Sequence, residues 1–197
     1  MRMRSPRHVY RDRRGVSVIE FALLAPVLMM LLMGLGDLLY QPYVQAILDG
    51  AVQKAGRDST LEENASDQRA IDDQVKAAVG SIAKDATFTS SRENYSAFAL
   101  IKPEPIQDAN GNGRLDSGEC FDDINGNGTY DTNPARTGQG GADDVTRYTM
   151  RVVYTRPFPV AELLGFPPTM TIEASTLLKN QPYARQTVRS IPRVCLP

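Results

Sequence analysis

The sequence has 197 residues, a formal net charge of −1 and two cysteines. This length allows one modest domain beside a membrane segment, because single domains commonly take about 100 to 150 residues. The near-zero charge hides an asymmetry, since residues 1–15 carry six arginines against one aspartate. The rest of the chain is therefore acidic, which argues against nucleic acid as a partner.

An almost uninterrupted apolar run follows these arginines, from Val16 to Gly36. At about 1.5 Å per helical residue, the run spans roughly the 30 Å of a bilayer core. The basic residues keep the N-terminus in the cytoplasm under the positive-inside rule, and Asp37 closes the other side of the run. A single-pass protein with its C-terminal part outside the cytoplasm is predicted. A buried core helix and a cleaved secretory signal are the alternatives, but the run is apolar all round and too long for a signal.

The apolar run contains one acidic residue, Glu20, whose insertion into hydrocarbon costs on the order of 3 kcal/mol. Gly15 followed by Val-Ser-Val-Ile-Glu-Phe resembles the class III leader of type IV pilins, which a membrane peptidase cleaves after the glycine. The longer stretch GVSVIEFALLAPVLMMLLMG, which includes Pro26, resembles the TadE-like pseudopilins of the tight-adherence (Tad, or Flp) pilus system.

This resemblance implies processing and partners. A prepilin peptidase would cut after Gly15 and create an α-amino group on Val16, and Glu20 would pair with that amine of a neighbouring subunit. The alternative for Glu20 is that its carboxylate snorkels to the cytoplasmic headgroups. The resemblance also implies an inner-membrane location, a periplasmic domain, and other pseudopilins and pilus-assembly membrane proteins as partners.

Beyond the run we predict an α+β fold: the long transmembrane helix continues into a small periplasmic domain whose helices pack on an antiparallel sheet. Apolar residues at steps of three and four extend the first helix to about Gly56, and a second helix begins with Asp67 as its cap. Alternating apolar and polar residues predict strands at 145–155 and 170–178. A third strand is predicted near 95–101.

Two further segments are predicted from proline and composition. The prolines around residues 160–164 bracket a short turn or helix. The tail after Gln181 is expected to be irregular.

Residues 108–119 read DANGNGRLDSGE, which matches the twelve-residue calcium-loop pattern of extracellular and EF-hand-like sites. Oxygen-bearing side chains alternate, a glycine permits the sharp turn, and the last residue can bind a cation with both carboxylate oxygens. The predicted ligands are Asp108, Asn110, Asn112, the backbone carbonyl of Arg114, Asp116 and Glu119.

A second copy follows at an offset of fifteen residues. Its predicted ligands are Asp123, Asn125, Asn127, Thr129 and Asp131. Pro134 stands where the last glutamate should be, so this copy is expected to borrow a ligand from Asp122 or Glu119. Glu119 itself is echoed fifteen residues earlier by Glu104. The alternative is a pair of Asn-Gly turns in a surface loop.

The two cysteines, Cys120 and Cys195, both lie on the exported side, where the compartment is oxidising. We expect them to pair within one chain, with two free thiols or a bond between subunits as the alternatives. The predicted division of the chain is a basic leader at 1–15, a transmembrane helix at 16–39, periplasmic helices and a first strand at 40–102, a calcium-loop insertion at 103–144, and the remaining strands with the tail at 145–197.

Catalysis is not expected. The single histidine, His8, lies on the cytoplasmic side, so no His-based triad or zinc site can form beyond the membrane. The sequence favours a minor pseudopilin or assembly component of a Tad-type pilus with a calcium-stabilised extracytoplasmic domain. The alternative is an uncleaved, membrane-anchored, calcium-dependent adhesin or envelope structural protein.

Overall fold

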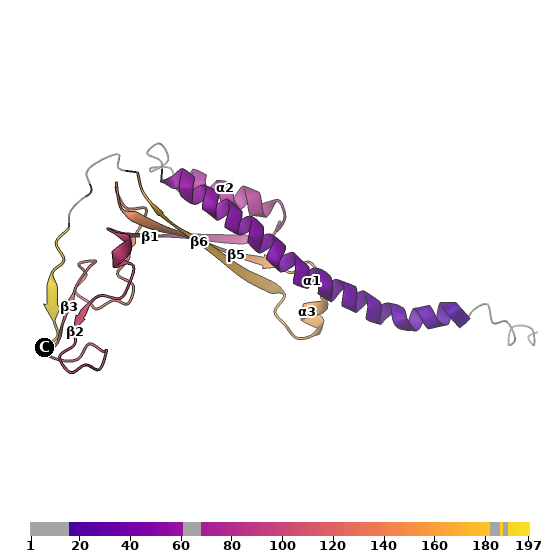
Figure 1. Ribbon diagram of the computed structural model, residues 1–197. Coiled ribbons are helices and arrows are strands. Elements are labelled where there is room, and N and C mark those ends of the chain that lie inside the picture. The colour runs from indigo at the N-terminus through magenta and orange to yellow at the C-terminus, as the bar shows by residue number, and fades with distance from the viewer. Residues whose placement is uncertain (1–15, 61–67, 182–185, 187–188) are drawn as a thin grey trace, which may run out of the picture. The chain divides into compact units, whose positions relative to one another are not determined.

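The computed structural model describes residues 16–60, 68–181, 186 and 189–197 (Figure 1). It has the predicted α+β fold, in which one long helix is followed by a small domain of helices and antiparallel sheets. The chain divides into two compact units, Met1–Tyr43 with Thr155–Met170, and Val44–Tyr154 with Thr171–Pro197.

Helix α1, Val16–Ser59, runs without a break through both of its prolines, Pro26 and Pro42. Its first half exposes apolar side chains all round: Val18 is 69%, Leu24 61% and Leu38 70% exposed. By length and composition this helix is able to cross a membrane. Among the described residues, this N-terminal helix is therefore the one suited to single-pass anchoring.

The first unit also contains the short helix α3, Val160–Leu163, at the place where a turn or helix was predicted. It packs against α1 through Val160, whose Cγ1 atom lies 4.0 Å from the position of a Cβ built on Gly34. An ion pair joins Asp37 of α1 to Arg156, which lies between β5 and α3.

The second unit is built on a four-stranded sheet in the order β4-β1-β5-β6. Its strands are β1 (Thr87–Tyr95), β4 (Arg136–Thr137), β5 (Val145–Thr155) and β6 (Thr169–Lys179). Strand β1 runs antiparallel to both of its neighbours. The strands predicted at 145–155 and 170–178 are thus confirmed.

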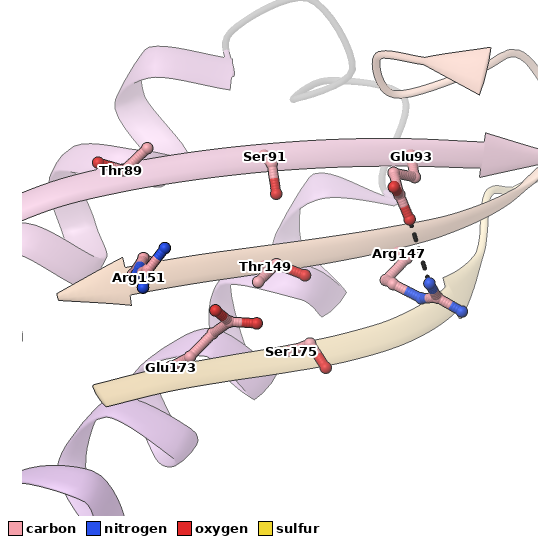
Figure 2. Close-up of a pocket in the computed structure, with 8 residues that line it drawn as sticks. All are labelled: Thr89, Ser91, Glu93, Arg147, Thr149, Arg151, Glu173 and Ser175. Carbon is pink, nitrogen blue, oxygen red and sulfur yellow. Dashed lines mark hydrogen bonds and ion pairs between the residues drawn. The ribbon is translucent and has the colours of Figure 1, made fainter. Parts of the chain in front are cut away.

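One face of this sheet is buried and the other is polar, because side chains alternate along each strand. Tyr148, Met150 and Val152 are each at most 1% exposed on the inner face. On the outer face Arg147 pairs with Glu93 at 3.1 Å. Figure 2 shows these two residues in a shallow polar groove with the following neighbours: Thr89, Ser91, Thr149, Arg151, Glu173 and Ser175.

Two helices supply the apolar partners of the inner face. The second half of α1 buries Val44, Leu48, Val52 and Ala55, and helix α2, Gln68–Gly80, buries Ile71, Val75 and Val79. A Cβ at Gly56 would collide with the side chains of Thr176 and Leu178, so a glycine is required where α1 meets β6. The predicted second helix is confirmed, whereas its expected cap, Asp67, lies outside the described residues.

The strand predicted near 95–101 is wrong. The strand observed there is β1, which ends at Tyr95, and residues 98–100 form a single 3₁₀ turn. The alternating pattern missed β1 because its inward side chains are polar: Arg92 is 9% and Asn94 4% exposed. Asn94 satisfies its amide by donating to the backbone carbonyls of Arg136 and Gly138, each at 3.0 Å.

The tail expected to be irregular also contains a strand. A second sheet has the order β2-β3-β7, with β2 at Ile106–Gln107, β3 at Cys120–Asp122 and β7 at Arg193–Cys195. Phe121 of β3 is fully buried and meets Tyr130 edge to face, with ring centroids 5.8 Å apart. Strand β7 has no local apolar pattern that could predict it, and its partner β3 lies far away in sequence.

A buried polar cluster fastens α2 to the sheet. The carboxylate of Asp72 accepts hydrogen bonds from Ser90 (2.6 Å), Arg92 (2.7 Å) and Tyr148 (2.8 Å). The guanidinium of Arg92 also stacks over the Tyr148 ring, 4.5 Å from its centroid. Burial works to raise the pKa of Asp72, but the hydrogen bonds from Arg92, Ser90 and Tyr148 outweigh it, and the pKa lies below its ordinary value of 3.8.

We predict that Asp72→Asn lowers the free energy of unfolding by about 3 kcal/mol, because it leaves the Arg92 charge buried without its partner. Denaturant unfolding of the full chain in detergent measures this loss. The matched control is Asp73→Asn, which breaks the exposed pair with Lys76 and should cost about 0.5 kcal/mol or less. Equal losses in both variants would contradict the role of Asp72.

The same carboxylate predicts a dependence on pH. Because the pKa of folded Asp72 is depressed, its stabilisation is present above the pKa of about 3.9 in the unfolded chain and is lost as the pH falls through the folded value. The stability gap between the parent chain and Asp72→Asn should therefore close in acid. A gap that stays constant from neutral pH into strong acid would contradict this assignment.

Candidate functional site

The first acidic loop, residues 108–119, connects β2 to β3. Asp108 organises its start, because the carboxylate accepts backbone N–H groups of Gly111 (2.6 Å), Asn112 (3.1 Å) and Gly113 (2.6 Å). The bond from Gly113 contributes most to holding the pKa of Asp108 below its ordinary value. Gly113 adopts φ +74°, the left-handed region in which glycine is favoured.

The second half of this loop is closed by two other carboxylates. Asp116 accepts the side-chain amides of Asn110 (2.9 Å) and Asn112 (2.6 Å). Glu119 accepts the backbone N–H of Ala109 at 2.9 Å and of Asp116 at 3.0 Å. The last glutamate thus bridges the beginning and the end of the loop.

The second loop, beginning at Asp123, repeats this geometry. Asp123 accepts the backbone N–H groups of Gly126 (2.6 Å), Asn127 (3.1 Å) and Gly128 (2.7 Å). The remaining contacts are also repeated: Asp131 accepts the side-chain amides of Asn125 (2.7 Å) and Asn127 (2.6 Å). The two loops therefore share one local structure and not only a sequence pattern.

Glu104 closes the second loop. Its carboxylate accepts the backbone N–H of Ile124 at 2.7 Å and of Asp131 at 2.9 Å. Those two residues are the counterparts of the two that Glu119 bridges in the first loop. Glu104 is 2% exposed, and its own N–H donates to the Asp131 carbonyl at 3.1 Å. A residue that precedes the first loop therefore takes the place left open by Pro134.

The other residues expected to serve the second loop have different partners. Asp122 pairs with Arg193 of β7 at 3.2 Å, and Glu119 is engaged in the first loop. Sequence reasoning registered the echo between Glu104 and Glu119 but did not assign Glu104 to the second loop. The offset of fifteen residues was the signal that could have found it.

Each loop offers carboxylate and amide oxygens, which are the ligands that hard cations prefer. The residues at the seventh loop position, Arg114 and Thr129, are held by bonds from their N–H groups to Asn112 (2.8 Å) and Asn127 (2.7 Å). Over the part of the chain that the structure describes, no three acidic, histidine or cysteine side chains gather as a metal cluster. The charge of each ninth-position aspartate is instead met by amide N–H groups. The donor chemistry of the loops fits calcium.

Arg136 anchors the second loop to the four-stranded sheet. Its guanidinium donates to the carbonyl of Ile124 at 2.8 Å and to that of Asn125 at 3.2 Å. Its backbone pairs with Asn94 where β4 meets β1. Burial, followed by the nearby charge of Arg189, lowers the pKa of Arg136.

The two cysteines meet between the loops. Cys120 and Cys195 form a disulfide, and they are directly paired residues of β3 and β7. The sequence places Cys120 immediately after Glu119 and three residues before Asp123. The covalent bond therefore fastens the tail at the junction of the two loops.

The tail makes backbone bonds to both loops as well. Leu196 N–H donates to the carbonyl of Glu119 at 2.9 Å, and Asp123 N–H donates to that of Pro192 at 2.9 Å. The tail thus binds the last residue of the first loop and the first residue of the second. Order in the tail and order in the loops are coupled.

The residues expected to be processed lie at the start of α1. Gly15 is outside the described residues, Val16 is the first residue of the helix, and the side chain of Glu20 is exposed on it.

Comparisons with known proteins bear on this part of the chain. Residues 15–57 match the family model described as TadE-like protein. No curated protein and no solved structure matches the chain. The likeness thus covers α1 and ends before the acidic loops.

We predict that replacing both cysteines with serine lowers the free energy of unfolding by about 4 kcal/mol, because the bond closes a long loop in the unfolded chain. It should also speed amide hydrogen exchange at residues 193–196. Exchange measured with and without reductant tests this in the parent chain. Unchanged exchange in the tail would show that the backbone bonds hold β7 without the disulfide.

Proposed function

We propose that this protein is a minor pseudopilin or assembly component of a Tad-type pilus, anchored in the inner membrane by α1 with its domain in the periplasm. The observation that carries the proposal is the match of residues 15–57 to the TadE-like family. That segment begins at Gly15, includes Glu20 and covers most of the exposed apolar helix. We assign the protein no catalysis of its own.

The proposed partners follow from the chemistry of the helix start. Cleavage after Gly15 by a prepilin peptidase would remove the basic leader and leave an amine on Val16. Glu20 lies about one turn further along α1, so its carboxylate can pair with the amine of a neighbouring pseudopilin. This pairing offsets the cost of a carboxylate in lipid only when subunits meet there, which couples membrane residence to assembly.

We predict that Glu20→Leu is inserted and cleaved normally but does not support pili, because the neighbour's amine loses its partner where water cannot replace it. Gly15→Leu should remain uncut. N-terminal sequencing of membrane-extracted protein, together with counting of pili, measures both results.

The conservative control is Glu20→Gln, which keeps the shape but not the charge and should behave like Glu20→Leu. A parent chain that still begins at Met1 in cells with an active prepilin peptidase would contradict the proposal. It would favour the alternative of an uncleaved, membrane-anchored adhesin or envelope structural protein.

The two acidic loops are proposed to bind calcium and thereby stabilise the domain. The support is the repeated geometry, in which Glu104 and Glu119 hold equivalent places in two loops of equivalent hydrogen bonding. The first loop would use Glu119 as its bidentate ligand, and the second would use Glu104. Dissociation constants of about 10⁻⁴ to 10⁻³ M are ordinary for extracellular modules.

Calorimetric titration of the full chain in detergent with calcium alone tests the two ligand sets separately. Glu119→Gln should weaken the first site and Glu104→Gln the second, each by about 10-fold or more, because a bidentate carboxylate becomes a neutral amide. Each variant should retain the other site. The matched control is Asp122→Asn, which changes a neighbouring acid that pairs with Arg193 and should leave both sites intact.

Three outcomes would count against this assignment. A parent chain without calcium-dependent heat or stabilisation at millimolar calcium would defeat the calcium proposal as a whole. If Asp122→Asn weakens calcium binding at the second loop and Glu104→Gln does not, the assignment of Glu104 is wrong, but the calcium proposal itself is not contradicted. If Asp108→Ala binds calcium as the parent chain does, Asp108 is not a ligand.

A further inference from the structure

An exposed apolar surface lies outside the long helix. It belongs to residues 156–168, here called the α3 hairpin, which connect β5 to β6. Its exposed side chains are Leu163 (73%), Leu164 (70%) and Phe166 (60%). Glu162 carries the only charge between residues 157 and 170. Grouped apolar side chains of this size at a surface mark a contact with another apolar phase or molecule.

The α3 hairpin is attached to α1 at the end of its apolar run. A Cβ built on Gly36 would lie 2.8 Å from the ring of Phe158, and one built on Gly34 would touch Val160. Gly36 therefore permits a close approach that a larger residue would prevent, whereas a side chain at Gly34 would meet Val160 at an ordinary contact distance. Figure 1 shows α3 beside α1 at this point. The hairpin thus lies at the level where a membrane span formed by α1 would end.

An ion pair at this level is internal to the first unit. Asp37 is the only charged residue of α1 between Glu20 and Asp49, and it pairs with Arg156 at the base of the α3 hairpin. The side chains are 11% and 18% exposed, respectively. Arg156 also reaches the sulfur of Met170 at 3.5 Å. Both charges are therefore neutralised where the apolar segment ends.

Part of the backbone of the α3 hairpin lacks a free N–H group, whereas the N–H groups of residues 158 and 160–162, around the start of α3, have no acceptor among the described residues. Four of its positions, 157, 159, 167 and 168, are prolines and have no donor. Internal carbonyls accept the N–H groups of Arg156, Leu164, Gly165 and Phe166, at 2.9 to 3.1 Å. Non-helical backbone is tolerated near hydrocarbon only when its polar groups are satisfied in this way.

We propose that the α3 hairpin is a second membrane-contacting element, which inserts Leu163, Leu164 and Phe166 into the lipid at the outer edge of the bilayer, next to α1. The inference rests on the membrane anchoring proposed for α1. Continuity with that surface favours lipid as the partner, because α1 itself exposes Leu35 (49%) and Leu38 (70%) at the same level. The protein would then contact the bilayer through the α1 span and through the α3 hairpin, here called the wedge. The wedge restricts rotation of α1 about its own axis, because it must stay in contact with the lipid.

The absence of tryptophan from the sequence makes a direct test available. The full chain, with a single tryptophan introduced, is reconstituted in phosphatidylcholine vesicles whose acyl chains are either plain or brominated. Four variants are compared: Phe166→Trp and Leu164→Trp as independent probes of the hairpin, Leu24→Trp in the span, and Phe98→Trp as an exposed aromatic of the second unit.

Bromine should quench Phe166→Trp and Leu164→Trp almost as strongly as Leu24→Trp, with emission shifted to the blue, and should leave Phe98→Trp unchanged. If bromine quenches Leu24→Trp while both hairpin probes are quenched only by acrylamide in the water, the α3 hairpin does not contact lipid. The membrane anchoring proposed for α1 would then still be supported. Hairpin probes shielded from both quenchers would assign this surface to a protein contact and also overturn the inference. An unquenched Leu24→Trp would instead show that the proposed anchor itself is absent.

Discussion

Helix α1 passes from one environment to another along its length. Its first half exposes leucines on every side, whereas from Val44 onward only one stripe is apolar and that stripe is buried. A helix that is apolar all round needs lipid or the interior of a large protein, and a domain of this size cannot provide the second. One unbroken backbone therefore joins a segment that requires a membrane to a segment that requires the sheet.

The acidic loops form an interlocked pair, because the glutamate that closes the second loop precedes the first in sequence. Glu119 is part of the first loop and bonds to Ala109 and Asp116 within it. Glu104 meets Ile124 where β2 pairs with β3, and the bond from Asp122 N–H to the carbonyl of Pro105 at 3.0 Å extends that pairing. The first loop connects β2 to β3, and this pairing brings Glu104 to the second loop. The two loops are therefore expected to become ordered together and not as independent modules.

The sequence allowed the helices, two long strands and both acidic loops to be predicted, because each has a local pattern. It did not allow β1 to be placed, since Arg92 and Asn94 face inward with partners that lie elsewhere in the chain. Strand β7 was missed for a related reason: its order depends on the distant β3. The role of Glu104 had a visible signal in its echo of Glu119, but only the pairing of β2 with β3 brings it to the second loop. Local pattern was sufficient for the helices and for β5 and β6, and insufficient for the strands and side chains whose partners are polar or distant in sequence.

These polar and covalent connections are concentrated in one part of the domain. The disulfide and the two loops meet within a few residues, at the junction around Cys120, and the tail bonds to both sides of it. A disulfide persists in an oxidising compartment, and calcium at the concentrations such loops require is found outside the cytoplasm. With the proposed topology, the disulfide forms and the proposed calcium ions bind at the junction only after the domain has crossed the membrane.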